Sequence, residues 1–301
     1  MGDKNFDHIK SENRSMQTLP QSENFLGLED SQSSFENAQA VILPIPYEGT
    51  TTYIKGTADG PAAILQASQQ VEYYDDELGS EPCMHGIATA EPLPFAGQSH
   101  KQALAKIGTA AQKIMQTEKF FVGIGGEHSI TIPIVRHAVE IFDNLSVLQL
   151  DAHSDLRDSY EGSPLNHACV MARVNECCDF VSVGLRSGII GEQKNIRPGA
   201  KLIYAREMVG NSDWQQAALA ALSENVYLTF DLDFLGTPEP GGFHWYQTLA
   251  FLKRVFAEKN VVACDVVELC PMPNVRHADF LAAKLVYKLI GYKFLHSSGV
   301  Q

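Results

Sequence analysis

The sequence predicts an α/β fold in which one domain holds a parallel β-sheet flanked by helices on both faces. From Ala38 onward, short runs of β-branched and aliphatic residues alternate with longer Ala-rich segments of helical period, and this alternation is typical of βα units. The hydrophobic content of 45% in 301 residues is enough for a large core. No internal repeat interrupts the alternation, so a single domain over 38–301 is the simplest organisation.

The expected elements follow from the same alternation of patterns. Strands are expected at Ala40–Leu43, Phe120–Gly123, Leu145–Leu150, Phe180–Gly184, Lys201–Tyr204, Val226–Phe230 and Val261–Val267. Helices are expected at Pro61–Gln69, His100–Gln116, Ile130–Ile141, Trp214–Leu222, Tyr246–Glu258 and Phe280–Ile290. The first of these helices begins with Pro61, and proline is well suited to the first helical position.

The N-terminal segment 1–37 differs from the rest in composition. It is rich in Ser, Asn, Gln and acidic residues and has too few apolar side chains to form a core alone, so it is predicted to be an extended polar arm. It has neither the apolar stretch of a secretory signal nor that of a membrane span. A cytoplasmic location is therefore expected, with no membrane partner.

Charge and cysteine content narrow the possible partners. Against 36 Asp and Glu residues there are 23 Lys and Arg, giving a net charge of -13, which repels nucleic acid and anionic lipid and favours cationic ligands. The six cysteines lack the spacing of a disulfide framework or a zinc knuckle. They are expected to be reduced and mostly buried, which also fits the cytoplasm.

Polar residues gather where the expected strands end, and parallel sheets bind ligands at the carboxyl ends of their strands. Leu145–Leu150 runs directly into Asp151-Ala152-His153-Ser154-Asp155. If this segment stays extended, its period of two turns Asp151, His153 and Asp155 to one side. The sequence therefore predicts that these three side chains converge on a common ion.

Three other strand ends add potential ligands. Gly125-Gly126, which permit a tight turn, precede Glu127-His128; Asp231 and Asp233 follow another buried run, where paired carboxylates are costly without a cation. Glu268 ends the last expected strand in an apolar setting.

Two imidazoles and four carboxylates from three strand ends fit two divalent ions. Nitrogen and carboxylate ligands without thiolate favour Mn²⁺, with Ni²⁺ or another divalent metal as alternatives. Paired metals activate water, so metal-assisted hydrolysis is expected. The metal site alone does not select the substrate, since phosphatases and aminopeptidases also use paired metals.

At this point the segments GGEHS, DAHSDLRDSYEGSPLNHA, FDLD, GTPEPGG and VVELCP resemble, in order and spacing, the motifs of the arginase/agmatinase (ureohydrolase) family. The resemblance spans about 44–292 and includes Pro46-Tyr47-Glu48-Gly49-Thr50. It implies an arginase-like fold, a trimer or hexamer of identical chains, and hydrolysis of a small guanidino compound to urea and an amine.

The resemblance also implies a role for each ligand-type residue. In that pattern His128 binds one metal and His153 the other, while two aspartates bridge both ions and two complete the shells. The bridging pair is Asp151 and Asp231, and the completing pair is Asp155 and Asp233.

Three residues would serve the reaction itself. Asp155 is expected to carry the proton to the leaving nitrogen. His167 matches the family's histidine at the mouth of the site and is expected to bind substrate and act as general acid or proton shuttle. Glu268 matches the carboxylate that accepts guanidinium hydrogen bonds.

The substrate is less determined by the pattern. Arginases carry an asparagine where this chain has Arg157, which favours a substrate without the α-carboxylate, and agmatine, cleaved to putrescine and urea, is the leading hypothesis. As an alternative, Arg157 would pair with the acidic tail of a substrate such as guanidinobutyrate. Guanidine and arginine are further candidate substrates.

The chain departs from the family pattern after Asp233, where relatives have a longer loop before the GTPxPGG turn. Either the loop is short in this protein or the printed sequence lacks residues there. A truncated loop would expose the second metal, so one rival is a non-catalytic metal-binding relative, although His167 and Glu268 are retained. A dinuclear phosphoesterase is a second rival, but it would need cationic groups for phosphate, and Glu268 would repel that substrate.

Overall fold

The computed structural model describes residues 16–236 and 239–295. Its centre is an eight-stranded sheet in the order β2-β1-β3-β8-β7-β4-β5-β6, and every neighbouring pair is parallel. The strands are β1 (Ala40–Ile45), β2 (Ile87–Thr89), β3 (Phe120–Gly125), β4 (Leu145–Leu150), β5 (Asp179–Leu185), β6 (Lys201–Tyr204), β7 (Asn225–Asp231) and β8 (Asn260–Val267). The predicted fold class is confirmed.

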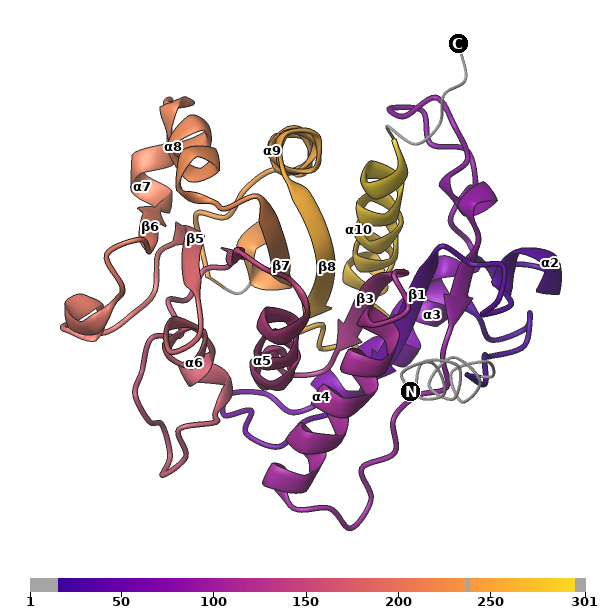
Figure 1. The fold of residues 1–301 in the computed structure, drawn as a ribbon, viewed down its shortest axis with the longest axis horizontal. Helices are drawn as coiled ribbons and strands as arrows, with labels where there is room; N and C mark the ends of the chain where they lie inside the picture. The colour runs from indigo at the N-terminus through magenta and orange to yellow at the C-terminus, as the bar shows by residue number, and fades with distance from the viewer. Residues whose placement is uncertain (1–15, 237–238, 296–301) are drawn as a thin grey trace, which may run out of the picture.

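Helices cover both faces of the sheet (Figure 1). One face packs against α3 (Gly60–Ser68), α8 (Asp213–Ala221), α9 (Trp245–Glu258) and α10 (His277–Phe294). The other packs against α4 (His100–Met115), α5 (Thr131–Ile141) and α6 (Val170–Asn175). The short helices α2 (Asp30–Ser33) and α7 (Ala205–Met208), and several 3-10 turns, complete the structure.

Each predicted strand and helix appears in the structure with its ends displaced by at most a few residues. The strand β2 and the helices α2, α6 and α7 were not predicted. Each is short, so the chain carries little periodic signal there. β2 still joins the sheet, because its three buried residues pair with β1 at the sheet's edge.

The predicted N-terminal arm is only partly described, because residues 1–15 lie outside the described residues. From Met16 onward the segment packs on the domain: Phe25 and Leu28 are 0% and 1% exposed within the core of one sheet face. Thr18 also pairs with Ala90 near the edge strand. The boundary at residue 37 stays a prediction, while the stretch from Met16 lies against the sheet instead of extending away.

The chain order explains where a ligand can bind. After β3 the chain continues to β4 and outward to β6, then returns with β7 and β8 to fill the centre of the sheet. Such a reversal leaves a crevice at the carboxyl ends of the central strands. The four strands that carry the predicted ligands, β3, β8, β7 and β4, are consecutive neighbours in the sheet.

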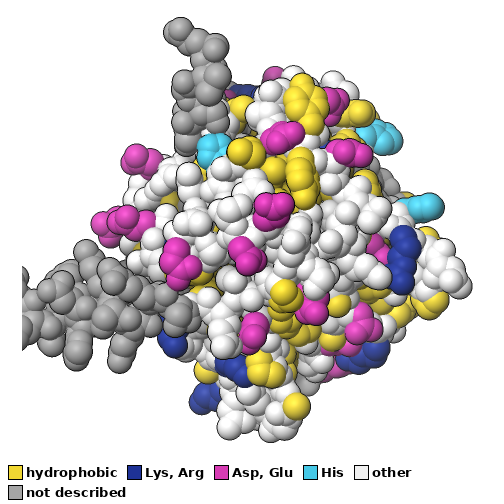
Figure 2. Space-filling model, turned by 90° about the vertical axis from the view of Figure 1, so that its right-hand side faces the viewer, with side chains coloured by type: hydrophobic (Ala, Val, Ile, Leu, Met, Phe, Trp, Pro, Cys, Tyr) yellow, Lys and Arg dark blue, Asp and Glu magenta, His cyan; other side chains and the backbone are white. Residues whose placement is uncertain are grey.

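No helix among the described residues is both long enough and apolar enough to cross a membrane. On the face shown in Figure 2, acidic side chains are scattered over much of the surface. This distribution agrees with the net charge of -13.

Candidate metal centre

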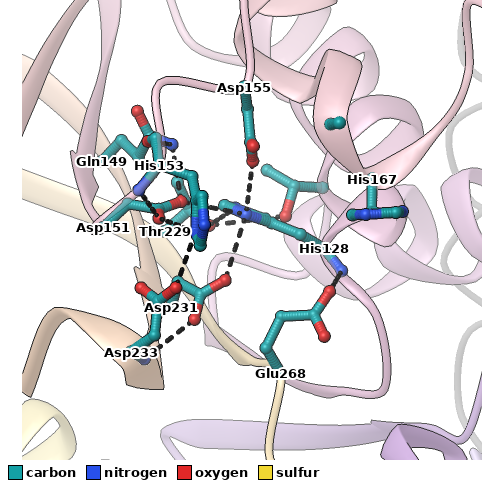
Figure 3. Close-up of polar contacts among 12 residues, drawn as sticks. His128, Gln149, Asp151, His153, Asp155, His167, Thr229, Asp231, Asp233 and Glu268 are labelled. Atoms are coloured by element: carbon teal, nitrogen blue, oxygen red, sulfur yellow. Dashed lines mark hydrogen bonds and ion pairs between the residues drawn. The ribbon is translucent and has the colours of Figure 1, made fainter. Parts of the chain in front are cut away.

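The first histidine of the cluster follows β3 in a 3-10 turn, η4 (His128–Ile130). The Nδ1 atom of His128 lies 3.3 Å from Asp151, 3.0 Å from Asp155 and 3.6 Å from Asp231, as Figure 3 shows. It is buried, yet none of these contacts has hydrogen-bond geometry. A buried nitrogen that faces three carboxylates without bonding to any of them is the arrangement expected of a metal ligand.

The second histidine lies at the outer side of the cluster. His153 Nδ1 is 2.7 Å from Asp233 Oδ2 and 3.7 Å from Asp151 Oδ1, and its side chain is 41% exposed. A bridge to Ser187, just after β5, holds its backbone. This histidine therefore faces solvent on one side and the carboxylates on the other.

Two groups of ligand atoms result, each within 4.8 Å: one contains His128, Asp151 and Asp231, and the other Asp151, His153 and Asp233. Asp151 belongs to both, which is what a bridging ligand requires. The bridging role predicted for Asp231 stays a prediction, because the structure groups it with His128. Asp155 adds its Oδ2 beside His128.

Electrostatics indicate that the cluster needs cations. Burial, together with the charges of Asp233 and Asp155, raises the pKa of Asp151 to about 7. Burial and the charges of Asp233 and Asp151 likewise raise the pKa of Asp231 well above its ordinary value. Like charges held together in a buried site are costly unless a cation lies between them. The residues therefore fit two divalent ions, as predicted.

The histidines respond to the same carboxylates. Burial lowers the pKa of His128, but the neighbouring Asp151 and Asp155 outweigh it and raise that pKa well above the usual value. The hydrogen bond with Asp233 raises the pKa of His153 to about 9. Burial tends to raise the pKa of Asp233, but the hydrogen bond with His153 outweighs burial, so that this pKa is lowered. In the absence of metal, protons on the histidines would partly replace the cations.

The backbone bends sharply at two positions of the site. Asp155 has φ +49° and Glu268 has φ +64°, a left-handed conformation that is uncommon outside glycine. The segment after β4 therefore does not remain extended as far as Asp155, contrary to the assumption behind the prediction. The turn nevertheless brings Asp155 to the cluster.

The pair after β7 also differs from expectation in its geometry. β7 ends at Asp231, and Asp233 lies in the following 3-10 turn, η7 (Leu232–Leu235), instead of on the same side of a strand. The Asp231 side chain caps that turn by accepting the backbone N–H of Asp233 at 2.9 Å. Both carboxylates still reach the cluster, one toward each histidine.

Glu268 follows β8 directly and is half-buried. Its Oε1 accepts the backbone N–H of His128 at 2.6 Å, and burial raises its pKa to about 8, with Glu127 and Asp155 contributing. Figure 3 shows Glu268 beneath His128 with its other oxygen turned away from that bond. This oxygen has no other hydrogen bond among the described residues, and the substrate-binding role of Glu268 stays a prediction.

His167 lies beside the cluster at the start of η5 (His167–Cys169), which packs against η4. It is half-buried, and burial lowers the pKa of its imidazole despite the opposing charges of Asp155 and Glu127. Figure 3 shows its ring at the edge of the cluster. This position fits the predicted proton shuttle.

Arg157 does not point to the cluster in the contacts that the structure describes. Its guanidinium lies over the ring of Tyr160 at 4.5 Å, and its Nε is 3.9 Å from Glu192. Glu192 in turn accepts a hydrogen bond from Ser154. The substrate-binding role of Arg157 stays a prediction.

Sequence reasoning missed the residues that support His128 from behind. Its Nε2 contacts Thr229 Oγ1 at 2.8 Å, and Thr229 donates to Asp265 Oδ1 at 2.6 Å. Asp265, which also accepts from Tyr227 and Thr131, is 0% exposed in the middle of β8. A single aspartate inside an apolar strand was the available signal, because charged side chains are seldom fully buried without partners.

The described residues on either side of 237–238, in the loop after Asp233, contact one another. Phe243 N–H bonds to Phe234 O at 3.1 Å, and the two rings stack. Arg186 donates to the carbonyl oxygens of Asp233 at 2.5 Å and Glu239 at 3.1 Å. Arg186 thus links the described residues that precede and follow 237–238.

With this geometry established, comparison with known proteins identifies the class of site. A sequence model of the Arginase family matches residues 38–291. The chain belongs to the arginase family. The resemblance noted in the motifs is thereby confirmed, and the chain is a ureohydrolase of this metal-dependent hydrolase family.

Relatives within the arginase family carry two activity names. The chain is 40% identical to the N(1)-aminopropylagmatine ureohydrolase of Synechocystis sp. over 86% of this chain and 90% of that protein. It is 35% identical to a protein of the same name from Thermus thermophilus, over 89% and 94%. It is 31% identical to the agmatinase of Pyrococcus horikoshii, over 85% and 92%.

Solved structures of the arginase family share the fold. The agmatine ureohydrolase of Thermoplasma volcanium superposes with a TM-score of 0.82 at 26% identity, covering 96% of this chain and all of that one. An arginase from Bacillus subtilis superposes with a TM-score of 0.70 at 24% identity, over 84% and 98%, which supports the fold alone.

Proposed function

We propose that this ureohydrolase uses two divalent ions to release urea from a guanidino polyamine, either N(1)-aminopropylagmatine or agmatine. The observation that carries the proposal is the pair of histidine–aspartate groups that share Asp151 at the centre of the sheet. The ions would be held by His128, Asp151, His153, Asp155, Asp231 and Asp233.

The chemistry divides between the ions and the protein. When bound, two divalent ions supply an activated water at neutral pH. The free oxygen of Glu268 accepts guanidinium N–H groups and orients the carbon to be attacked. Asp155 carries a proton to the leaving nitrogen, and His167 exchanges protons with solvent at the rim of the site.

Substrate choice rests on charge. Arg157 is engaged by Glu192 and Tyr160, so it offers little to the acidic tail of guanidinobutyrate or arginine. Glu239 is half-exposed beside His153, 3.8 Å from its Nε2, and adds negative charge at the rim. The net charge of -13 also favours a polycation. The names of the 40% and 35% identical relatives favour the aminopropylated compound over agmatine.

The remaining expectations belong to the same proposal. Nitrogen and oxygen ligands favour Mn²⁺, with Ni²⁺ as the alternative. A homo-oligomer and a cytoplasmic location continue to be proposed, the latter because the six cysteines form no disulfide in the structure.

The test is a urea-release assay on the Mn²⁺-loaded and the Ni²⁺-loaded protein. The substrates are N(1)-aminopropylagmatine, agmatine, guanidinobutyrate, arginine and guanidine, and the amine product is identified by chromatography. Asp231→Asn serves as the inactive variant, and Asp213→Asn, which removes the same charge from an exposed position, serves as the matched control.

Spermidine and urea from aminopropylagmatine, at a higher kcat/KM than for agmatine, would support the favoured substrate. Putrescine and urea from agmatine at the higher kcat/KM would select agmatine instead. Preferential hydrolysis of an acid-tailed compound would overturn the polyamine proposal. Absence of urea from every compound, with two ions bound, would overturn the ureohydrolase assignment of this chain.

A further inference from the structure

A second buried carboxylate lies beside the cluster without belonging to either group of ligands. Glu127 precedes His128 and is 0% exposed. Its Oε2 accepts the backbone N–H groups of Gly49 at 2.7 Å, Thr50 at 2.5 Å and Thr51 at 3.1 Å. One carboxylate therefore anchors the backbone of the loop that follows β1.

Hydroxyl groups complete the surroundings of Glu127. Thr51 Oγ1 donates to Oε2 at 3.2 Å, and Thr50 Oγ1 donates to Oε1 at 2.7 Å. Ser129 Oγ also donates to Oε1. Because backbone N–H groups and neighbouring hydroxyls surround both oxygens of Glu127, the carboxylate acts as the acceptor and the single hydroxyl proton of Thr50 points toward it.

The other side of the Thr50 hydroxyl faces His167. Thr50 Oγ1 accepts the backbone N–H of His167 at 3.0 Å and lies 3.2 Å from its Nδ1. Since the hydroxyl proton is already given to Glu127, the proton between Thr50 and His167 must belong to Nδ1. The neutral imidazole therefore has a bare Nε2, the nitrogen on the far side of the ring from Thr50.

We propose that Glu127 and Thr50 are positioning residues that hold His167 in the Nδ1–H tautomer and so leave its Nε2 free to exchange protons at the reaction site. The inference deepens the proposed function and rests on it for its kinetic consequences, whereas the tautomer itself can be measured without turnover. Positioning of this kind has large effects on general acid–base groups, because the wrong tautomer presents a proton where a lone pair is needed.

Thr50 and Thr51 form a matched pair for the test. Both hydroxyls donate to Glu127, but only the Thr50 hydroxyl contacts His167. Thr50→Val removes the contact with His167 while keeping the shape of the side chain. Thr51→Val removes one hydrogen bond to Glu127 and leaves His167 untouched, and Thr50→Ser restores the hydroxyl.

The decisive measurement is the tautomer of His167 by ¹⁵N NMR of the histidine-labelled, full-length protein. Zn²⁺ is used as a diamagnetic probe ion, and the spectrum is recorded near pH 8, about 1.5 units above the usual pKa of histidine. The His167 signals are assigned by their loss in His167→Gln. The expected spectrum has a protonated Nδ1 and a bare Nε2 in the wild type, Thr51→Val and Thr50→Ser, and a shift toward Nε2–H in Thr50→Val.

Kinetics of the Mn²⁺ enzyme provide the second readout. Thr50→Val is expected to lower kcat by about 10- to 100-fold with little change in KM or in bound metal. Thr50→Ser is expected to recover most of this loss, and Thr51→Val is expected to resemble the wild type.

An Nε2–H tautomer in the wild type would overturn the proposal, as would an equal loss of kcat in Thr51→Val and Thr50→Val. The first result would show that Thr50 donates to His167, and the second that the loop matters only as a whole. If the wild type releases no urea from any guanidino compound, the proposed function fails, and the NMR tautomer alone decides whether Glu127 and Thr50 position His167.

Discussion

Asp151 lies between the two groups of ligand atoms in the candidate metal site. Besides facing both histidines, it is held by Gln149 Nε2 at 2.7 Å and by the backbone N–H of His153 at 2.6 Å. Asp233, by contrast, faces only one of the two histidines, His153, and also accepts the backbone N–H of Ala152 at 2.9 Å. The two aspartates are chemically alike and differ in how many ions they would serve.

Asp151→Asn is expected to reduce the binding of both ions, whereas Asp233→Asn is expected to weaken only the ion beside His153. The reason is that Asp151 alone is shared by the two groups. Bound metal per chain, measured by elemental analysis after dialysis, should fall from two to near zero in the first variant and to near one in the second. Equal losses in both variants would contradict this assignment of ligands.

Glu268→Gln is expected to lower kcat/KM by about 10- to 100-fold, because a charge-assisted hydrogen bond to the guanidinium is worth about 1.5–3 kcal/mol. The backbone bond from His128 can be kept by the amide oxygen of glutamine. Bound metal should therefore stay at the wild-type level, which separates this variant from the ligand variants. An unchanged kcat/KM would exclude Glu268 from the substrate site.

Among the elements, the two ends of the turn that follows η7 approach each other closely. Gly236 has φ +116°, and a Cβ on Gly242 would lie 2.0 Å from the Gly236 Cα. The two ends of the turn therefore touch, backbone against backbone. Glu239, which lies between these two glycines in the chain, has its Oε1 3.8 Å from His153 Nε2.

Gly242→Ala is expected to lower the melting temperature and kcat together, since the added methyl group must push the ends of the turn apart. The control is Gly210→Ala, where φ is +67° but the space around the Cβ is open, so its cost is limited to about 1–2 kcal/mol of left-handed strain. Thermal unfolding monitored by circular dichroism compares the two. A smaller destabilisation in Gly242→Ala than in Gly210→Ala would contradict the close approach.

The two glycines of the GGEHS segment, Gly125 and Gly126, are needed because of what packs against them. Neither Gly125 nor Gly126 has a positive φ, so the backbone freedom of glycine at positive φ is not what this segment uses. A Cβ on Gly126 would lie 2.1 Å from the Tyr47 carbonyl oxygen, and one on Gly125 would meet Ile130 and Val267. The close approach of the Tyr47 backbone requires glycine at 126, and the packed side chains of Ile130 and Val267 leave no room for a Cβ at 125.

At the scale of the whole molecule, the metal-free protein carries an unfavourable charge cluster. The folded-state pKa values of Asp151, Asp231 and Glu268 lie above those of the unfolded chain, so the folded state binds more protons and loses stability as pH rises. The raised pKa of His153 acts in the same direction, because its stabilisation is lost as pH rises toward about 9. The lowered pKa of Asp233 acts oppositely, but only in the acid range.

The melting temperature of the metal-free protein is therefore expected to fall from about pH 5 to about pH 9, the range spanned by these pKa values. Saturating Mn²⁺ should raise the melting temperature more near pH 8 than near pH 5.5, since protons compete with metal for the same ligands. Calorimetry with and without a chelator checks both trends. A melting temperature that rises with pH in the chelated protein would contradict the charge cluster.

The sequence by itself determined the fold class and the ligand inventory. Hydrophobic runs of strand length and Ala-rich helical periods are local signals, so the central strands and the long helices could be located without knowledge of their neighbours. The segment from Asp151 to Asp155 and the pair Asp231 and Asp233 could likewise be recognised, because ligand-type residues directly follow buried strands.

Only the tertiary structure decided which residues meet. Three features depend on contacts between segments far apart in the chain. Asp151 is shared by the two groups of ligand atoms, Arg157 lies beside Glu192, and Glu127 accepts hydrogen bonds from the loop that carries Thr50. Local periodicity carries no information about such pairings, and left-handed bends such as those at Asp155 and Glu268 are imposed by the surrounding packing. The reaction class is therefore visible in the ligand pattern, while the orientation of each catalytic group depends on the fold.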